Sequence, residues 1–78
     1  MSNLNSFYMA DVIFDGSDGE MHGVNIFGNN FVELIEAIEE KENQVGDSLE
    51  IWSALFIYGG ETSHIKMKVI ETLKARKK

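Results

Sequence analysis

The sequence of 78 residues predicts an α+β fold in the order ββαββ: a four-stranded, mainly antiparallel sheet with one helix packed on one face and a short basic C-terminal tail. Two pairs of strand-like segments, each joined by a glycine-containing turn, and one segment of helical periodicity between them support this fold. Residues 1–78 are therefore expected to form one small domain, with a hairpin over 6–27, a helix over 30–44, a hairpin over 48–70 and the tail over 71–78.

The first hairpin is predicted from composition and turn chemistry. The segment SFYMADVIF, which starts at residue 6, is rich in β-branched and aromatic side chains, and these favour strands. It ends in DGSDG, where two Asp-Gly pairs within five residues give a strong turn signal. The segment EMHGVNIF then provides the returning strand.

The segment after the first hairpin changes to helical periodicity. Asn30, followed three residues later by Glu33, resembles a capping box, and the carboxylate of Glu33 also suits the positive N-terminal end of a helix. Gly46 is a natural end for this helix. Four apolar side chains at positions i, i+3, i+4 and i+7 form one stripe: Phe31, Leu34, Ile35 and Ile38.

The second hairpin is predicted around Gly59-Gly60, because two adjacent glycines supply the positive φ angles of a two-residue turn. Residues 63–70 then have two interpretations. Their alternation indicates a strand that returns along the preceding one, with a short helical tail from Glu71. A helix is the alternative, because three apolar side chains are spaced four residues apart: Ile65, Val69 and Leu73. We favour the strand, because its register places its apolar side chains beside the aromatic ones of the preceding strand.

The two faces of this second hairpin are expected to differ, because one helix covers only one face of a small sheet. The face expected to pack against the helix carries Trp52, Phe56, Ile65 and Met67. The opposite face is expected to be an open aliphatic strip edged by long basic side chains. Such a strip is typical of a dimer or partner surface. This strand face consists of Leu49, Ile51, Leu55, Ile57, His64, Lys66 and Lys68.

The charges are distributed unevenly along the chain. Residues 1–65 carry twelve acidic side chains and one basic one, whereas residues 66–78 carry one acidic and six basic ones. Carboxylates on the polar side of the predicted helix, together with two in the first hairpin, predict an acidic face for a basic partner. This acidic face consists of Glu33, Glu36, Glu39, Glu40, Asp15 and Asp18.

Catalytic and ligand motifs are incomplete in this sequence. GVNIFGNN has the glycine spacing of a phosphate-binding loop but lacks its lysine, and DGSDGE fails the pattern of a calcium loop at its sixth position. His22 and His64 lie in different hairpins and have no cysteine to complete a zinc site. LFIYGG resembles the short aromatic strand motif of RNA-recognition domains, but the longer companion motif is missing. We therefore expect no catalytic residue, no cofactor, no metal and no enzymatic activity.

The location of the protein is predicted from its N-terminus and composition. MSNLNSFYMADV has neither the basic start nor the apolar core of a signal peptide, and no stretch approaches the length of a membrane helix. The chain also has no cysteine for disulfides. A cytoplasmic protein without membrane contact is the expectation.

Composition and charge together predict a non-catalytic, acidic protein-binding module, a small inhibitor or regulator of a nucleic-acid-handling protein that could also form a homodimer. Its carboxylates could imitate phosphate spacing, as in an anti-defence role such as anti-CRISPR or anti-restriction, an analogy of size and charge only. The alternative is a weak nucleic-acid-binding protein that acts through the basic C-terminal segment. That segment contains Lys66, Lys68, Lys74, Arg76, Lys77 and Lys78.

Overall fold

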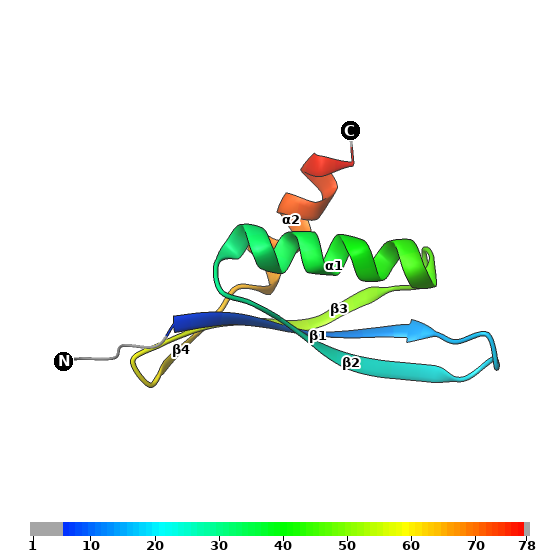
Figure 1. Cartoon of the computed structure of the whole chain (residues 1–78), viewed down its shortest axis with the longest axis horizontal. Helices are drawn as coiled ribbons and strands as arrows, with labels where there is room; N and C mark the ends of the chain where they lie inside the picture. Colours follow the sequence, from blue (N-terminus) through cyan, green and yellow to red (C-terminus); the bar gives the residue numbers. More distant parts are fainter. Residues whose placement is uncertain (1–5, 78) are drawn as a thin grey trace.

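A computed structural model describes residues 6–77 as a four-stranded antiparallel sheet with two helices on one of its faces (Figure 1). The strands lie in the order β2-β1-β3-β4. Helix α1 contacts β1 and β2, and helix α2 contacts β3, so the molecule has two layers. The elements are β1 (Ser6–Asp15), β2 (Met21–Gly28), α1 (Phe31–Val45), β3 (Glu50–Tyr58), β4 (Glu61–His64) and α2 (Lys66–Arg76).

The predicted capping of α1 is confirmed. The side-chain oxygen of Asn30 accepts a hydrogen bond from the backbone N–H of Glu33 at 2.9 Å. The carboxylate of Glu33 accepts one from the backbone N–H of Asn29 at 3.0 Å, so that two otherwise unpaired donors are satisfied. Gly28 lets α1 start close to the end of β2, because a Cβ atom there would lie 2.5 Å from the backbone nitrogen of Leu34.

The hydrophobic core lies between the helices and the sheet. The paired residues Ala10 and Ala54 are buried in the middle of the sheet, and their small side chains let the helical side chains approach closely. Burying each large apolar side chain of the core stabilises the folded state by about 1.5–3 kcal/mol. The core consists of Ala10, Val12, Leu34, Ile35, Ile38, Ala54, Val69 and Leu73.

A β-bulge in β3 corrects part of the predicted sheet faces. Ser53 pairs with Asp11 and Ile51 pairs with Val12, so Trp52 is an extra residue opposite no partner on β1. Because the bulge reverses the alternation of side chains, Ile51 packs against the core rather than away from it. Trp52 is 67% exposed, so the prediction that it faces the helix is wrong.

The same bulge corrects the predicted open strip. Leu49, like Ile51, packs against the core on the helix side, although both were expected on the open face. On the other side of the bulge the predicted alternation is preserved. There Ala54 is buried in the core, and Leu55 is therefore directed to the opposite face.

Residues 63–70 do not form a strand to their end, and the helical alternative is correct. The predicted turn is confirmed, since Gly59 and Gly60 have φ angles of 58° and 85°, but β4 ends at His64. Helix α2 begins at Lys66, so residues 71–76 continue this helix and do not form a separate basic tail; Lys78 lies outside the described residues. A four-stranded sheet is about 19 Å wide, whereas a helix with side chains is about 10–12 Å across. Helix α1 therefore leaves β3 uncovered, and α2 covers it by burying Val69 and Leu73.

We expect Trp52→Ala to change the free energy of unfolding by less than about 1 kcal/mol, because most of the indole surface is exposed. By contrast, Leu34→Ala should cost about 2–5 kcal/mol, because Leu34 is fully buried. Urea denaturation followed by circular dichroism measures both. A large loss for Trp52→Ala would show that this side chain packs inside the folded chain.

Candidate functional site

The open face is the face of the sheet opposite α1 and α2. In the part of the chain that the structure describes, no element covers it (Figure 1). Three of its large apolar side chains are strongly exposed: Met21 (68%), Phe27 (56%) and Trp52 (67%). A contiguous apolar surface of this kind usually marks an interaction site. The apolar side chains of the open face are Phe7, Met9, Ile13, Met21, Phe27, Trp52, Leu55 and Ile57.

One carboxylate lies in the middle of the open face. Asp11 is on the inner strand β1, half-buried, and accepts a hydrogen bond from the hydroxyl of Ser53 at 3.0 Å. It lines a shallow hollow of about 370 Å³ together with Ile13, Met21 and Trp52. Every lysine and arginine within residues 6–77 belongs to α1, to α2 or to the position directly after α2. The open face therefore combines apolar side chains with a central negative charge.

The residues predicted for the strand face are divided by the structure. Leu55 and Ile57 lie on the open face, and His64 pairs with Leu55 at the end of β4. Leu49 and Ile51 are on the helix side because of the bulge. Lys66 and Lys68 belong to α2, and the ammonium of Lys68 lies 4.7 Å from the centre of the Phe31 ring. No periodicity in the sequence indicates the bulge, so the contribution of Trp52 to the open face could not be predicted.

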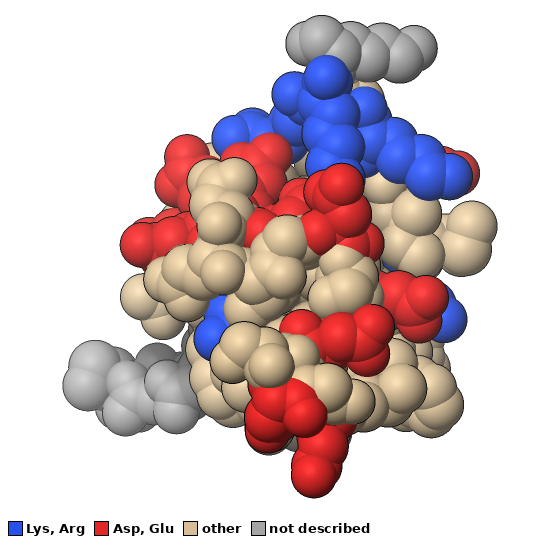
Figure 2. All heavy atoms as spheres, turned by 90° about the vertical axis from the view of Figure 1, so that its right-hand side faces the viewer, with Lys and Arg blue, Asp and Glu red and all other residues tan. Residues whose placement is uncertain are grey.

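The acidic side of α1 is partly neutralised by α2. Arg76 donates two hydrogen bonds to the carboxylate of Glu39, at 2.8 and 3.1 Å, and Lys77 donates one to Glu42 at 2.8 Å. Figure 2 shows acidic side chains spread over this end of the molecule, with basic ones gathered mainly above them, where α2 lies. Two basic side chains of the predicted segment are thus paired with carboxylates of α1.

The other predicted acidic residues lie at two places. Glu33, Glu36 and Glu40 are exposed along α1, whereas Asp15 and Asp18 are exposed at the tip of the first hairpin. The carboxylate of Asp18 accepts a hydrogen bond from the backbone N–H of Glu20 and lies 3.1 Å from the imidazole of His22. The backbone hydrogen bond to Glu20, and then the interaction with His22, lower the pKa of Asp18. Because its pKa is lowered, Asp18 is ionised at neutral pH, where the lysines and arginines of a partner are also charged.

The ion pairs between the helices change the pKa values of their members. The hydrogen bonds from Arg76 hold the pKa of Glu39 below its usual value, and Glu39 in turn raises the pKa of Arg76. Glu42 raises the pKa of Lys77 through its hydrogen bond. Because the pKa of Glu39 is lowered in the folded state, its pairing stabilises the fold above the usual pKa. This contribution is lost as the pH falls through the lowered value.

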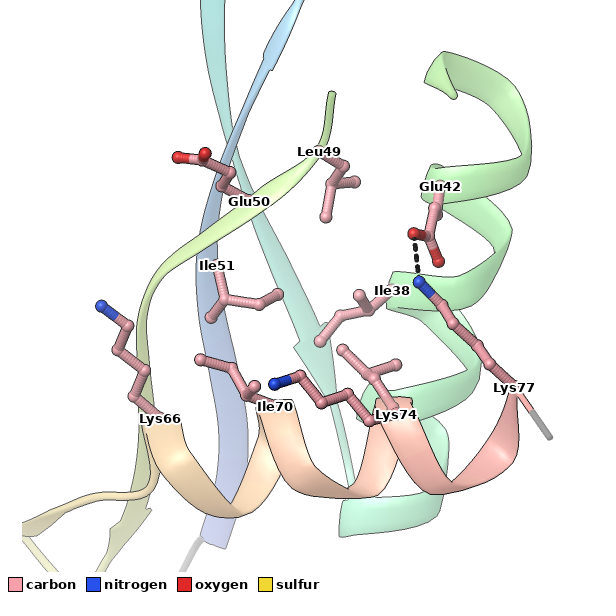
Figure 3. A pocket seen from close by; sticks show the side chains of 10 residues that line it. Ile38, Glu42, Leu49, Glu50, Ile51, Lys66, Ile70, Lys74 and Lys77 are labelled. Atoms are coloured by element: carbon pink, nitrogen blue, oxygen red, sulfur yellow. Dashed lines mark hydrogen bonds and ion pairs between the residues drawn. The ribbon is translucent and has the colours of Figure 1, made fainter. Parts of the chain in front are cut away.

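A second concave surface is the helix groove, which lies between α1, α2 and β3 (Figure 3). It has a volume of about 350 Å³ and an aliphatic floor with charged side chains of both signs on its rim. Lys77 extends to Glu42 along one rim, and Lys74 extends from α2 toward Ile70. The mixed charges of the rim favour no single class of ligand. The floor consists of Ile38, Leu49, Ile51, Ile70 and Leu73.

Replacing Glu39 with glutamine should reduce the sensitivity of the fold to acid. The melting temperature of the parent chain should fall as the pH drops through the usual pKa of glutamate and below it, partly because Glu39 becomes protonated and releases Arg76. In Glu39→Gln this fall should be smaller, because that carboxylate is absent. Thermal unfolding followed by circular dichroism at several pH values measures the difference.

The matched control for this prediction is Glu40→Gln. It removes an exposed carboxylate of the same helix that pairs with no basic side chain within residues 6–77. The pH profile of this variant should follow that of the parent chain. Equal flattening in both variants would show that the net charge of α1, rather than the pair with Arg76, determines the response.

Residues 6–77 contain no group of three or more side chains placed to hold a metal ion, and their helices are too short or too polar to cross a membrane. Their buried polar side-chain atoms all have hydrogen-bond partners. No protein family, curated protein or solved structure matches this chain at a significant level.

Proposed function

We propose that the protein is a non-catalytic, acidic protein-binding module, a small inhibitor or regulator that docks a basic partner on its open face. The observation that carries this proposal is the composition of that face: apolar side chains around the central carboxylate of Asp11, with no lysine or arginine among its described residues. A partner surface with apolar side chains and a central arginine or lysine complements it.

The position of Asp11 favours a different protein over a second copy of the chain. In a face-to-face dimer the open faces would lie about 10 Å apart, and each would bring its Asp11 carboxylate toward the other. Two carboxylates removed from water without a cation destabilise an interface. An arginine from a partner would instead pair with the carboxylate that Ser53 already orients.

The size of the open face also indicates how far a partner must extend. The sheet has three strands of eight to ten residues and a fourth of four residues, which together give an area on the order of 500 Å². A standard interface buries about 800 Å² on each partner. We therefore expect the partner to continue beyond the sheet, onto the acidic tip of the first hairpin at Asp15 and Asp18.

The exposed carboxylates give this module a preference for basic proteins. Their field accelerates the encounter with a positively charged partner and repels acidic ones. Proteins that handle nucleic acids carry basic surfaces, so the proposed partner class is a nucleic-acid-handling protein. Inhibition of such a partner could serve an anti-defence role, such as anti-CRISPR or anti-restriction inhibition. The charge of this chain is the sole observation that supports that role.

Nucleic-acid binding through the C-terminal segment has less support. Arg76 and Lys77 are engaged by carboxylates of α1, and a phosphate backbone would have to displace Glu39 and Glu42 to reach them. Within the described residues Lys66, Lys68 and Lys74 remain, and Lys78 lies outside them. So few phosphate contacts give weak binding that salt readily abolishes.

The proposed docking is tested by Leu55→Lys, because Leu55 lies on the open face and outside the core. The tagged parent chain should capture a basic protein from its native cell, with release at high salt. Leu55→Lys should keep its circular dichroism spectrum and lose that capture. The matched control is Ala75→Lys, which adds the same charge at an exposed position of α2.

Two outcomes would contradict the proposal. Capture that survives Leu55→Lys would show that the open face is not the docking surface. Failure of the parent chain to retain any basic protein would show that its charge does not select such partners.

A further inference from the structure

The two outer strands of the sheet differ in the protection of their free backbone edges. β4 has four residues, all polar or charged, and the chain continues from it into α2 after one residue. β2 has eight residues and, among the described strands, pairs only with β1. It contains no proline, lysine, arginine or carboxylate, and its register with β1 is uninterrupted. Edge strands are usually protected by shortness, charge, proline or bulges, so β2 offers an open template for another strand.

One flank of α1 lies beside this free edge. Glu39, which pairs with α2, marks the flank of α1 that faces β3, because α2 covers that strand. At 100° per residue, Ala37 and Lys41 lie on the other flank, on the side of β2. Glu33 precedes them in the same row, at an interval of four residues. The row beside the edge therefore begins with an acidic side chain, has a small one in the middle and ends with a basic one.

The two charges of this row lie at opposite ends of β2. The ammonium of Lys41 lies 5.0 Å from the centre of the Phe14 ring, and Phe14 pairs with His22 near the start of β2. Glu33 instead lines a small hollow with Gly28, the last residue of β2. A two-fold axis through the middle of β2 therefore brings the negative end of one row beside the positive end of the other.

A second copy of the chain fits this edge in both backbone and charge. When two β2 strands pair antiparallel about a two-fold axis perpendicular to the sheet, both α1 helices lie on the same face of the joined sheet. Each Lys41 then lies on the side of Glu33 of the second copy, and the two Ala37 residues lie near the axis. The small side chain of Ala37 suits this position, because neighbouring helices pack about 8–10 Å apart.

We infer that the free edge of β2 binds the β2 strand of a second copy, which joins two four-stranded sheets into one. Side chains opposite each other in this pairing lie on the same face of the sheet. The register that places Met21 opposite Phe27 of the second copy brings together the two strongly exposed apolar side chains of β2. In that register the two-fold axis passes through Val24.

This dimer leaves the open face of each copy accessible. Both open faces lie on the same side of the joined sheet, and both β2 strands separate β1 of one copy from β1 of the other. The two Asp11 carboxylates, which oppose a face-to-face dimer, therefore do not meet. The inference goes beyond the proposed function and does not depend on it.

Association of the parent chain is the first test. Its mass by light scattering should rise from one chain toward two as the concentration increases to about 1 mM, where complexes with dissociation constants up to the millimolar range form. In a mixture of isotopically labelled and unlabelled chains, nuclear Overhauser effects between copies should connect Met21 with Phe27. The amides of β2 should exchange more slowly in the dimer, while those of β4 stay unchanged.

Charge reversal tests the contact between Glu33 and Lys41. Lys41→Glu and Glu33→Lys should each weaken the dimer about tenfold or more, because like charges then face each other across the axis. A mixture of the two variants should restore association, because one chain then has only acidic and the other only basic side chains at these two positions. Circular dichroism of each variant shows whether α1 is intact.

The matched control is Glu40→Lys. It makes the same change on the side of α1 that is directed away from the sheet, so this variant should associate like the parent chain. Leu55→Lys should also associate like the parent chain, because β1 separates its strand from β2. Loss of partner capture and loss of the dimer are thus distinguished.

Three results would overturn the inference. A mass of one chain at about 1 mM would show that the edge does not pair with a second copy. Contacts between copies at Leu55 instead of β2 would place the interface on the open face. If the two folded charge variants associate no better together than alone, Glu33 and Lys41 do not face each other across an interface.

Discussion

The structure depends on one constraint: both helices bury their apolar stripes against the same face of the sheet. The stripe of α1 packs over β1 and β2, and Val69 and Leu73 of α2 extend the same core over β3. Within residues 6–77 no third layer covers the other face, so Phe27 and Trp52 stay exposed there. The open face is thus a direct consequence of how the single core is completed, and the proposed docking of a partner follows from it.

The elements defined by local signals could be predicted from the sequence. The turn residues predicted the two hairpins, and the cap at Asn30 together with the apolar stripe predicted α1. The bulge at Trp52 could not be predicted, because it depends on the pairing of β3 with β1 and leaves no local mark. The prediction of a strand in place of α2 was wrong because two patterns compete in this segment. Its side chains do alternate through Met67, as in a strand, but the burial of Val69 and Leu73 over the uncovered strand β3 favours a helix.

The candidate site, like the fold, could be predicted from the sequence only in part. Leu55 and Ile57 were correctly assigned to the open face because they lie on the predicted side of the bulge, whereas Leu49 and Ile51 lie beyond it. The sequence identifies the acidic residues, but it does not show which basic side chains pair with them. Contacts such as Arg76 with Glu39 join residues far apart in the sequence, so they depend on how the two helices pack. Two ion pairs between the helices therefore neutralise part of the charge asymmetry of the sequence within the fold.

The bulge in β3 also gives the open face an intrinsic fluorescent probe of its occupation. Because the extra residue of the bulge is Trp52, and it is the only tryptophan of the chain, the intrinsic fluorescence of the protein comes mainly from that face. An exposed indole emits at long wavelength and shifts to shorter wavelength when a surface covers it. Occupation of the open face can therefore be followed in the unlabelled protein, in dilute solution and in mixtures with partners that lack tryptophan, while the core beneath it stays spectroscopically almost silent.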